Sequence, residues 1–134
     1  MLSDDNRKKL VQAALEARRW AYAPYSHYAV GAALLTASGR VYDGVNVENA
    51  AYPTGICAER VAVFKAISEG ARRFRRIVVA ADTEALTPPC GACRQILWEF
   101  CGDLEIVLVN LKGNTKSHRM ADLFPRPFDD SYLH

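Results

Sequence analysis

Residues 77–111 read IVVAADTEALTPPCGACRQILWEFCGDLEIVLVNL, and this stretch decides the fold. It opens and closes on short apolar runs, 77–81 and 105–111, which are typical of buried strands. Between them we expect a helix that begins near Cys90 and ends at Gly102. Two strands that are joined by a helix in this way run parallel, and the helix covers one face of their sheet.

The chain before this stretch has a similar pattern. Residues 41–47 (VYDGVNV) predict a strand, and a helix follows over about 57–69. Residues 29–37 (AVGAALLTA) predict a further strand, which is joined to 41–47 by a tight turn at 38–39. The order strand–helix–strand–helix–strand from 41 to 111 therefore contains two crossover units.

The two ends of the chain complete the predicted domain. Near the N-terminus, apolar residues follow helical spacing at Leu10, Val11, Ala14, Leu15 and Ala21. Pro24 is expected to end this helix. After residue 111 we expect a short strand and a turn. Together these elements predict one domain over residues 1–134. Its fold class is α/β, a three-layer α/β/α sandwich around a mixed five-stranded sheet that opens on an antiparallel hairpin.

The composition excludes several classes of partner. Of the 134 residues, 50% are hydrophobic and 24% are charged, and the net charge of +2 is too small to predict binding to nucleic acid. No apolar stretch approaches the roughly 18 residues of a membrane span, and no signal peptide is evident. We therefore expect a cytoplasmic protein without membrane or nucleic-acid partners. In a reducing compartment, its four cysteines suggest metal binding or catalysis before disulfides.

Three of the cysteines stand where helices are predicted to begin. Cys57 opens the helix of 57–69, and Cys90 and Cys93 form a C-x-x-C pair at the start of the next helix. Helix N-termini favour thiolate over thiol. Zinc fits this set best, because three sulfur ligands in tetrahedral geometry leave a fourth position open for water.

Glu59 separates this site from a structural or redox cysteine site. A lone C-x-x-C also occurs in redox pairs and in structural zinc sites. A carboxylate two residues after Cys57 can instead lie beside the water and move its proton. The zinc-dependent deaminases have a known pattern of this kind: cysteine ligands, a glutamate that is not a ligand, and a P-C-x-x-C motif.

Four stretches carry a closer resemblance, namely 21–35 (AYAPYSHYAVGAALL), 44–51 (GVNVENAA), 55–67 (GICAERVAVFKAI) and 88–97 (PPCGACRQIL). In this order they resemble the small homotetrameric cytidine deaminases, and the resemblance runs from about residue 8 to Phe128. It implies hydrolytic deamination of cytidine and 2'-deoxycytidine to uridine and 2'-deoxyuridine plus ammonia, in pyrimidine salvage.

The resemblance also implies roles for single residues. Cys57, Cys90 and Cys93 would hold one zinc ion per subunit, and Glu59 would be the proton donor and acceptor. Asn46 and Glu48 would bind the ribose, chiefly at its 3'-hydroxyl, and the Ala58 backbone N–H would meet the pyrimidine carbonyl. Tyr28 and Val47 would also contact the substrate. Two further aromatic residues have two open interpretations each. Tyr52 either lines the ribose pocket of a neighbouring subunit or simply packs, and Phe128 either stacks near the base in the oligomer or packs in the tail.

Two positions depart from the family pattern. Phe is frequent in the family where Tyr28 stands, so the aromatic wall carries an additional hydroxyl here. Pro88 replaces a small polar residue before P-C-G-A-C, which removes a donor and stiffens the loop.

The spacing of single residues along the chain supports three further predictions. Asn46 and Glu48 are two positions apart on a strand, so their side chains share one face. Arg60 is three residues after Cys57, on the same face of a helix, where its guanidinium can donate to the thiolates. Cys101, eight residues after Cys93, is expected to be a buried small apolar residue.

Three alternatives remain open on the sequence. The first is a blasticidin-type deaminase of the same fold, against which the pair Asn46 and Glu48 argues. The second is a nucleic-acid editor, which needs a basic, aromatic groove. The third is a non-enzymatic zinc module with Cys101 as the fourth ligand, against which Glu59 argues. Deaminases with a histidine ligand fit less well, because the chain has no H-x-E motif.

Overall fold

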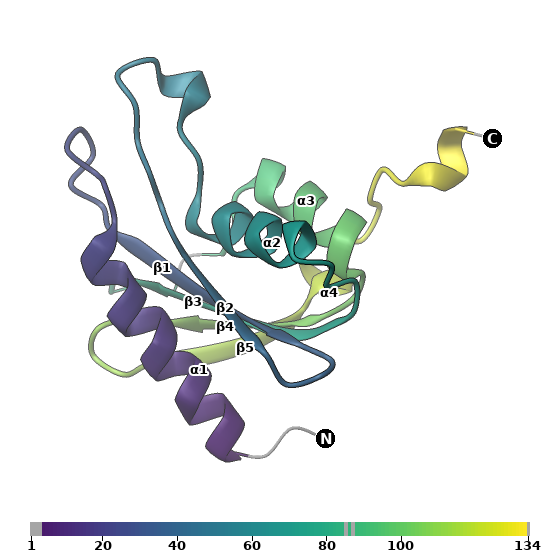
Figure 1. Cartoon of the computed structure of the whole chain (residues 1–134), viewed down its shortest axis with the longest axis horizontal. Helices are drawn as coiled ribbons and strands as arrows, with labels where there is room; N and C mark the ends of the chain where they lie inside the picture. Colours follow the sequence, from purple (N-terminus) through teal and green to yellow (C-terminus); the bar gives the residue numbers. More distant parts are fainter. Residues whose placement is uncertain (1–3, 85, 87, 134) are drawn as a thin grey trace.

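A mixed sheet forms the centre of the molecule (Figure 1). The computed structural model describes residues 4–84, 86 and 88–133. Within these residues the sheet has five strands in the order β2-β1-β3-β4-β5. β3 and β4 pair in parallel, and the other neighbouring strands are antiparallel. The strands are β1 (Val30–Thr36), β2 (Val41–Val45), β3 (Phe74–Ala81), β4 (Glu105–Val109) and β5 (Thr115–Arg119).

Helices cover both faces of this sheet, which confirms the predicted three-layer sandwich. α1 (Asp4–Ala17) packs on one face, where Leu10 and Ala14 meet Ala33 and Leu35 of β1. α2 (Ala58–Ser68) and α3 (Gly91–Cys101) lie on the other face (Figure 1). Alternate residues of each buried strand therefore contribute to two separate apolar cores, as the two-residue period of a strand requires.

The two predicted crossover units differ in detail. The unit β3–α3–β4 joins strands that are direct neighbours. The unit β2–α2–β3 also joins strands of the same direction, but β1 lies between them and pairs antiparallel with both. The hairpin β1–β2 turns at Gly39, whose φ of +96° is readily adopted by glycine.

Gly44 on β2 allows α2 to approach the sheet closely. A Cβ atom at this position would lie 2.4 Å from the Ala58 carbonyl oxygen and 2.6 Å from the Ala62 nitrogen. The first turn of α2 can take this position because residue 44 has no side chain. That turn carries several of the predicted site residues, so the absence of a side chain at Gly44 allows these residues to lie close to the sheet.

The end of the first helix differs from the prediction. α1 ends at Ala17 and continues as the 3-10 helix η1 (Arg18–Trp20), and Ala21, expected to be helical, is extended. The cause is a bridge between Tyr22 and Val47. The Tyr22 N–H donates to the Asn46 carbonyl at 2.9 Å, and the Glu48 N–H donates to the Tyr22 carbonyl at 2.8 Å. Helical backbone at Tyr22 is incompatible with these two bonds.

The remaining elements are short. The predicted strand of the tail is present as β5, and it is followed by α4 (Met120–Leu123) and the 3-10 helix η3 (Asp130–Leu133). A further 3-10 helix, η2 (Tyr52–Thr54), precedes α2. In the part of the chain that the structure describes, each helix is too short or too polar to cross a bilayer.

Candidate active site

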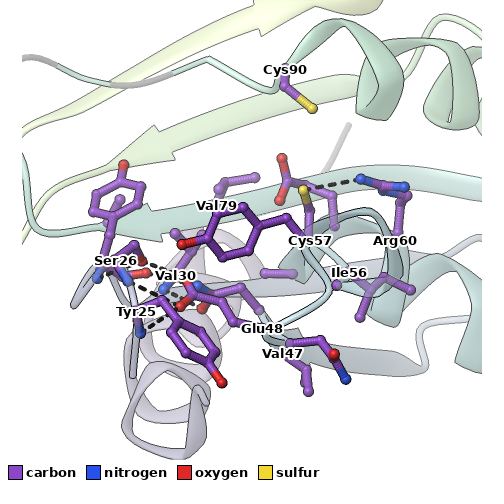
Figure 2. Close-up of a pocket in the computed structure, with 18 of the residues that line it drawn as sticks. Tyr25, Ser26, Val30, Val47, Glu48, Ile56, Cys57, Arg60, Val79 and Cys90 are labelled. Carbon is purple, nitrogen blue, oxygen red and sulfur yellow. Dashed lines mark hydrogen bonds between the residues drawn. The ribbon is translucent and has the colours of Figure 1, made fainter. Parts of the chain in front are cut away.

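A pocket of about 640 Å³ opens beside the start of α2 (Figure 2). Three parts of the chain meet there: the segment 25–30 before β1, the segment 46–49 after β2, and the residues 55–60 that lead into α2. Pro88 and Cys90, before α3, form a further part of its wall. The volume lies within the range of small-molecule sites and suits a ligand of the size of a nucleoside.

The three predicted zinc ligands lie together at one end of this pocket. Cys57 is the N-cap of α2, Cys90 is the N-cap of α3, and Cys93 lies in the first turn of α3. Their sulfur atoms lie within 4.8 Å of one another. Cys57 and Cys90 point toward one another from the two helices (Figure 2). The structure therefore brings together side chains that are 33 to 36 positions apart in the sequence.

This cluster fits zinc. Sulfur atoms that share one tetrahedral zinc ion at about 2.3 Å lie about 3.8 Å from one another, which small side-chain rotations can reach from the observed cluster. Cys101 stands at the last position of α3, about 12 Å along the helix axis from Cys93. It is a free, partly buried cysteine whose pKa is raised to about 12 by burial. Its place on the helix argues against the alternative in which it is a fourth ligand.

The protonation state of the clustered cysteines depends on Arg60 and on the hydrogen bonds between the thiols. The Arg60 guanidinium donates from Nη2 to Cys57 Sγ at 3.3 Å (Figure 2). The hydrogen bond from Cys93, together with Arg60, lowers the pKa of Cys57 to about 5, although burial opposes this shift. The hydrogen bond to Cys57, together with burial, raises the pKa of Cys93. The cluster thus holds a thiolate at neutral pH, the form that binds metal.

Glu59 lies in the first turn of α2 and contributes to the pocket wall. It is 6% exposed. Burial raises the pKa of its carboxyl group, and the nearby Cys57 charge adds to this shift. A carboxyl group with a raised pKa can both take and release a proton near neutral pH.

Asn46 and Glu48 both line the pocket, and both are bonded to the segment before β1. Asn46 Oδ1 accepts from the Val30 N–H at 2.9 Å, and its Nδ2 donates to the Tyr28 carbonyl at 2.7 Å. Glu48 Oε1 accepts from the N–H groups of Tyr25 and Ser26, at 3.0 and 3.1 Å. Ser26 Oγ donates to Glu48 Oε2.

The other predicted contacts fall into two groups. Tyr28, Val47, Tyr52 and Ala58 line the pocket, and Tyr52 is largely exposed at its rim, edge-on to Tyr25. Phe128 does not line it. Its ring stacks on Tyr132 with centroids 5.7 Å apart, in a tail that extends away from the sheet (Figure 1). Within a single chain, Tyr52 therefore lines the pocket and Phe128 does not.

Tyr25 and Ser26 were missed as individual site residues by reasoning from the sequence. They lie between α1 and β1, where neither a helical nor a strand period continues. A polar connection that follows Pro24 reads as an ordinary loop. The available signal was the general one that loops at strand ends carry binding residues.

Comparison with known proteins agrees with this geometry. Residues 4–109 match the model of the cytidine and deoxycytidylate deaminase zinc-binding region. The chain is 49% identical to a cytidine deaminase of Sporosarcina psychrophila over 127 residues, 94% of this chain and 93% of the relative. It is 48% identical to a cytidine deaminase of Halalkalibacterium halodurans, over 92% of this chain and 94% of the relative.

A solved structure shows the same fold. The 1.6 Å crystal structure of cytidine deaminase from Burkholderia pseudomallei superimposes with a TM-score of 0.87 and 46% sequence identity, covering 90% of this chain and 98% of that one. The match of the family model spans most of the chain and includes all three clustered cysteines and Glu59. The chain belongs to the cytidine and deoxycytidylate deaminase family.

Proposed function

We propose that this protein is a zinc-dependent hydrolase that converts cytidine and 2'-deoxycytidine to uridine and 2'-deoxyuridine, with release of ammonia. One observation carries the proposal: three clustered cysteine sulfurs and the buried Glu59 adjoin the same nucleoside-sized pocket. The similar proteins of Sporosarcina psychrophila and Halalkalibacterium halodurans are named cytidine deaminases, which supports the reaction on cytidine.

Each residue of the cluster then has a defined task. Cys57, Cys90 and Cys93 would hold one zinc ion per subunit, at the end of the pocket where Cys57 and Cys90 form part of the wall. The chemistry that zinc supplies when bound is the activation of a water molecule near neutral pH. Glu59 takes the proton of that water and delivers it to N3 of the pyrimidine. It then takes the second proton of the water from the hydroxyl group at C4 and passes it to the amine at C4. A C4–O bond thereby replaces the C4–N bond, and ammonia leaves.

The rest of the pocket orients the nucleoside. The first N–H groups of a helix have no partner within the helix, and Ala58 is the first residue of α2. Its N–H can therefore bind the pyrimidine carbonyl. Asn46 retains one N–H and Glu48 one lone pair beyond the bonds given above. A 3'-hydroxyl can accept from the first and donate to the second. Because both nucleosides carry this hydroxyl, the site serves cytidine and deoxycytidine.

We infer a homotetramer in which neighbouring chains complete the sites. The support is the family resemblance and a set of exposed large side chains: Tyr52 is 74% exposed, Phe128 57% and Tyr132 68%. A second copy that covers the tail would bury Phe128 and Tyr132 and could bring Phe128 to a substrate base. Light scattering should give four chains per particle at micromolar concentration, and an active monomer would refute the assembly.

We also propose that the chain works as a single deaminase domain over residues 1–134, in pyrimidine salvage in the cytoplasm. The thiolate cluster supports this location, because zinc ligation needs cysteines that stay reduced. Action on a free nucleoside, without a phosphate, fits the recovery of nucleosides from nucleic-acid breakdown.

A substrate panel tests the proposed reaction. The zinc-loaded protein is assayed by absorbance with cytidine, deoxycytidine, cytosine, dCMP and blasticidin S. We expect turnover of both nucleosides, little turnover of the free base, and loss of activity after chelation. Turnover of dCMP alone, or of blasticidin S in preference to cytidine, would contradict the assignment.

A further inference from the structure

Ser26 links two parts of the pocket wall. Its hydroxyl donates to Glu48 Oε2 and accepts from the Tyr28 N–H at 3.1 Å. Tyr25, Ser26 and Glu48 lie together on one side of the pocket (Figure 2). One hydroxyl group therefore connects the carboxylate after β2 with the backbone of the aromatic residue before β1.

The backbone around Ser26 is folded for this contact. His27 has a φ of +56°, a left-handed conformation that is uncommon for a residue other than glycine. This conformation turns the chain back after Ser26, so that the Tyr28 N–H meets the Ser26 hydroxyl. The His27 N–H bonds to the Ala23 carbonyl at 3.0 Å, which closes the turn.

Counting the acceptor positions of Glu48 shows what the contact does. A carboxylate has about four lone-pair positions, two on each oxygen. The N–H groups of Tyr25 and Ser26 use both positions on Oε1, and the Ser26 hydroxyl uses one on Oε2. One position on Oε2 remains. Among the described residues, the Ser26 hydroxyl is thus the hydrogen-bond partner on the same oxygen as this remaining position, and it helps to orient that position.

We propose that Ser26 is a positioning residue for the sugar of the substrate: it aims the free lone pair of Glu48 Oε2 at a ribose hydroxyl. This inference rests on the proposed function, because it assigns the sugar to Glu48. It extends that function to a residue that would not itself touch the reacting atoms.

The electrostatics of Glu48 are consistent with this role. The hydrogen bonds from the Ser26 hydroxyl and backbone lower the pKa of the Glu48 carboxyl group. The carboxylate thus stays ionised at neutral pH, and both of its oxygens then act only as acceptors.

A double-mutant cycle tests the inference. kcat/KM for cytidine is measured for the wild type, Ser26→Ala, Glu48→Ala and the double variant, each with its zinc content and melting temperature. We expect Ser26→Ala to lose about tenfold, since one hydrogen bond to a charged group is lost while two others remain. In the Glu48→Ala background the same change should cost less than twofold, because Ser26 acts through Glu48.

Two further variants sharpen the result. Ser26→Thr keeps the hydroxyl and should restore most of the activity that Ser26→Ala loses. Ser38→Ala removes a serine hydroxyl that bonds to Thr36 in the exposed hairpin turn, and it should behave as the wild type.

The contrary outcomes are distinct. Wild-type protein that does not deaminate cytidine would refute the proposed function itself. An active wild type with Ser26→Ala within twofold of it would overturn only the role of Ser26. Equal losses in both backgrounds, or loss of the fold in Ser26→Ala, would show that Ser26 supports structure in general and would overturn the inference as well.

Discussion

Arg60 Nη2 lies 3.3 Å from Cys57 Sγ, one helical turn along α2 from the cysteine. Zinc with three thiolates carries a formal charge of −1, which weakens it as a Lewis acid. With zinc bound, the two helix N-termini would offset part of this charge, and the Arg60 guanidinium would offset more by donating to Cys57 Sγ. The contact confirms the geometry that the three-residue spacing predicts.

Arg60→Gln should therefore lower activity or zinc affinity about 10–100-fold. The glutamine keeps a polar side chain but loses the positive charge beside Cys57. Turnover of cytidine and zinc retention against a chelator are measured side by side. Lys65→Gln is the matched control, because Lys65 lies on the same helix and pairs with Asp43 at the surface. If Arg60→Gln matches Lys65→Gln in both measurements, Arg60 is an ordinary surface charge.

Glu48→Ala should reduce kcat/KM for cytidine about ten- to hundredfold, since a charge-assisted hydrogen bond to the sugar is lost. Zinc content should not change, because Glu48 bonds to residues 25 and 26 and not to the cysteines. Free cytosine has no ribose, so any activity on it should stay the same. Glu69→Ala, at an exposed pair with Arg40, is the control. Equal losses on cytidine and cytosine would assign Glu48 to the fold.

The sequence allowed the layers of the fold and the metal cluster to be predicted, because both depend on strong local signals. Apolar runs in the sequence indicate β3 and β4. The cysteines stand at the starts of two predicted helices, and they come together because both helices pack on the same face of the sheet. The placement of β1 between β2 and β3 depends on pairing between distant strands, which no local pattern states. The same holds for the bridge of Tyr22 with Val47 that ends the first helix early.

At the site, the sequence indicated which residues line the pocket better than it indicated which residues they bond to. Asn46 and Glu48 were predicted to share a face of a strand over 41–47. β2 ends at Val45, and both residues line the pocket from the segment that follows it. Their bonds to residues 25–30 could not be predicted, because they depend on the path of an irregular segment. Phe128 lies away from the pocket in a single chain, so its predicted contact depends on a second chain.

Stability should depend on pH through Glu105. Burial acts to raise the pKa of its carboxyl group, but the Ser117 hydroxyl, at 2.7 Å, and the Arg76 guanidinium outweigh it and lower the pKa. A carboxyl group with a lowered folded pKa stabilises the protein above its unfolded pKa of about 4.3, and the effect is lost as the pH falls through the folded value. Glu105→Gln should thus cost about 1–3 kcal/mol at pH 7.

Urea unfolding of both proteins between pH 7 and pH 3 measures this dependence. The difference between wild type and Glu105→Gln should shrink as the pH falls below about 4. Loss of zinc at low pH affects both proteins equally and cancels in the difference. A difference that stays constant over this range would show that the ionised form of Glu105 contributes no stability.

Glu59→Gln tests the central claim most directly, because Glu59 is the only residue assigned to proton transfer. The amide has nearly the same shape, so zinc content and melting temperature should stay close to those of the wild type. Turnover of cytidine should fall by at least 10²–10⁴-fold, the usual contribution of general acid–base catalysis, since two transfers pass through this group. The measurement is the rate of uridine formation by the zinc-loaded variant. Near-normal turnover with zinc retained would contradict the account.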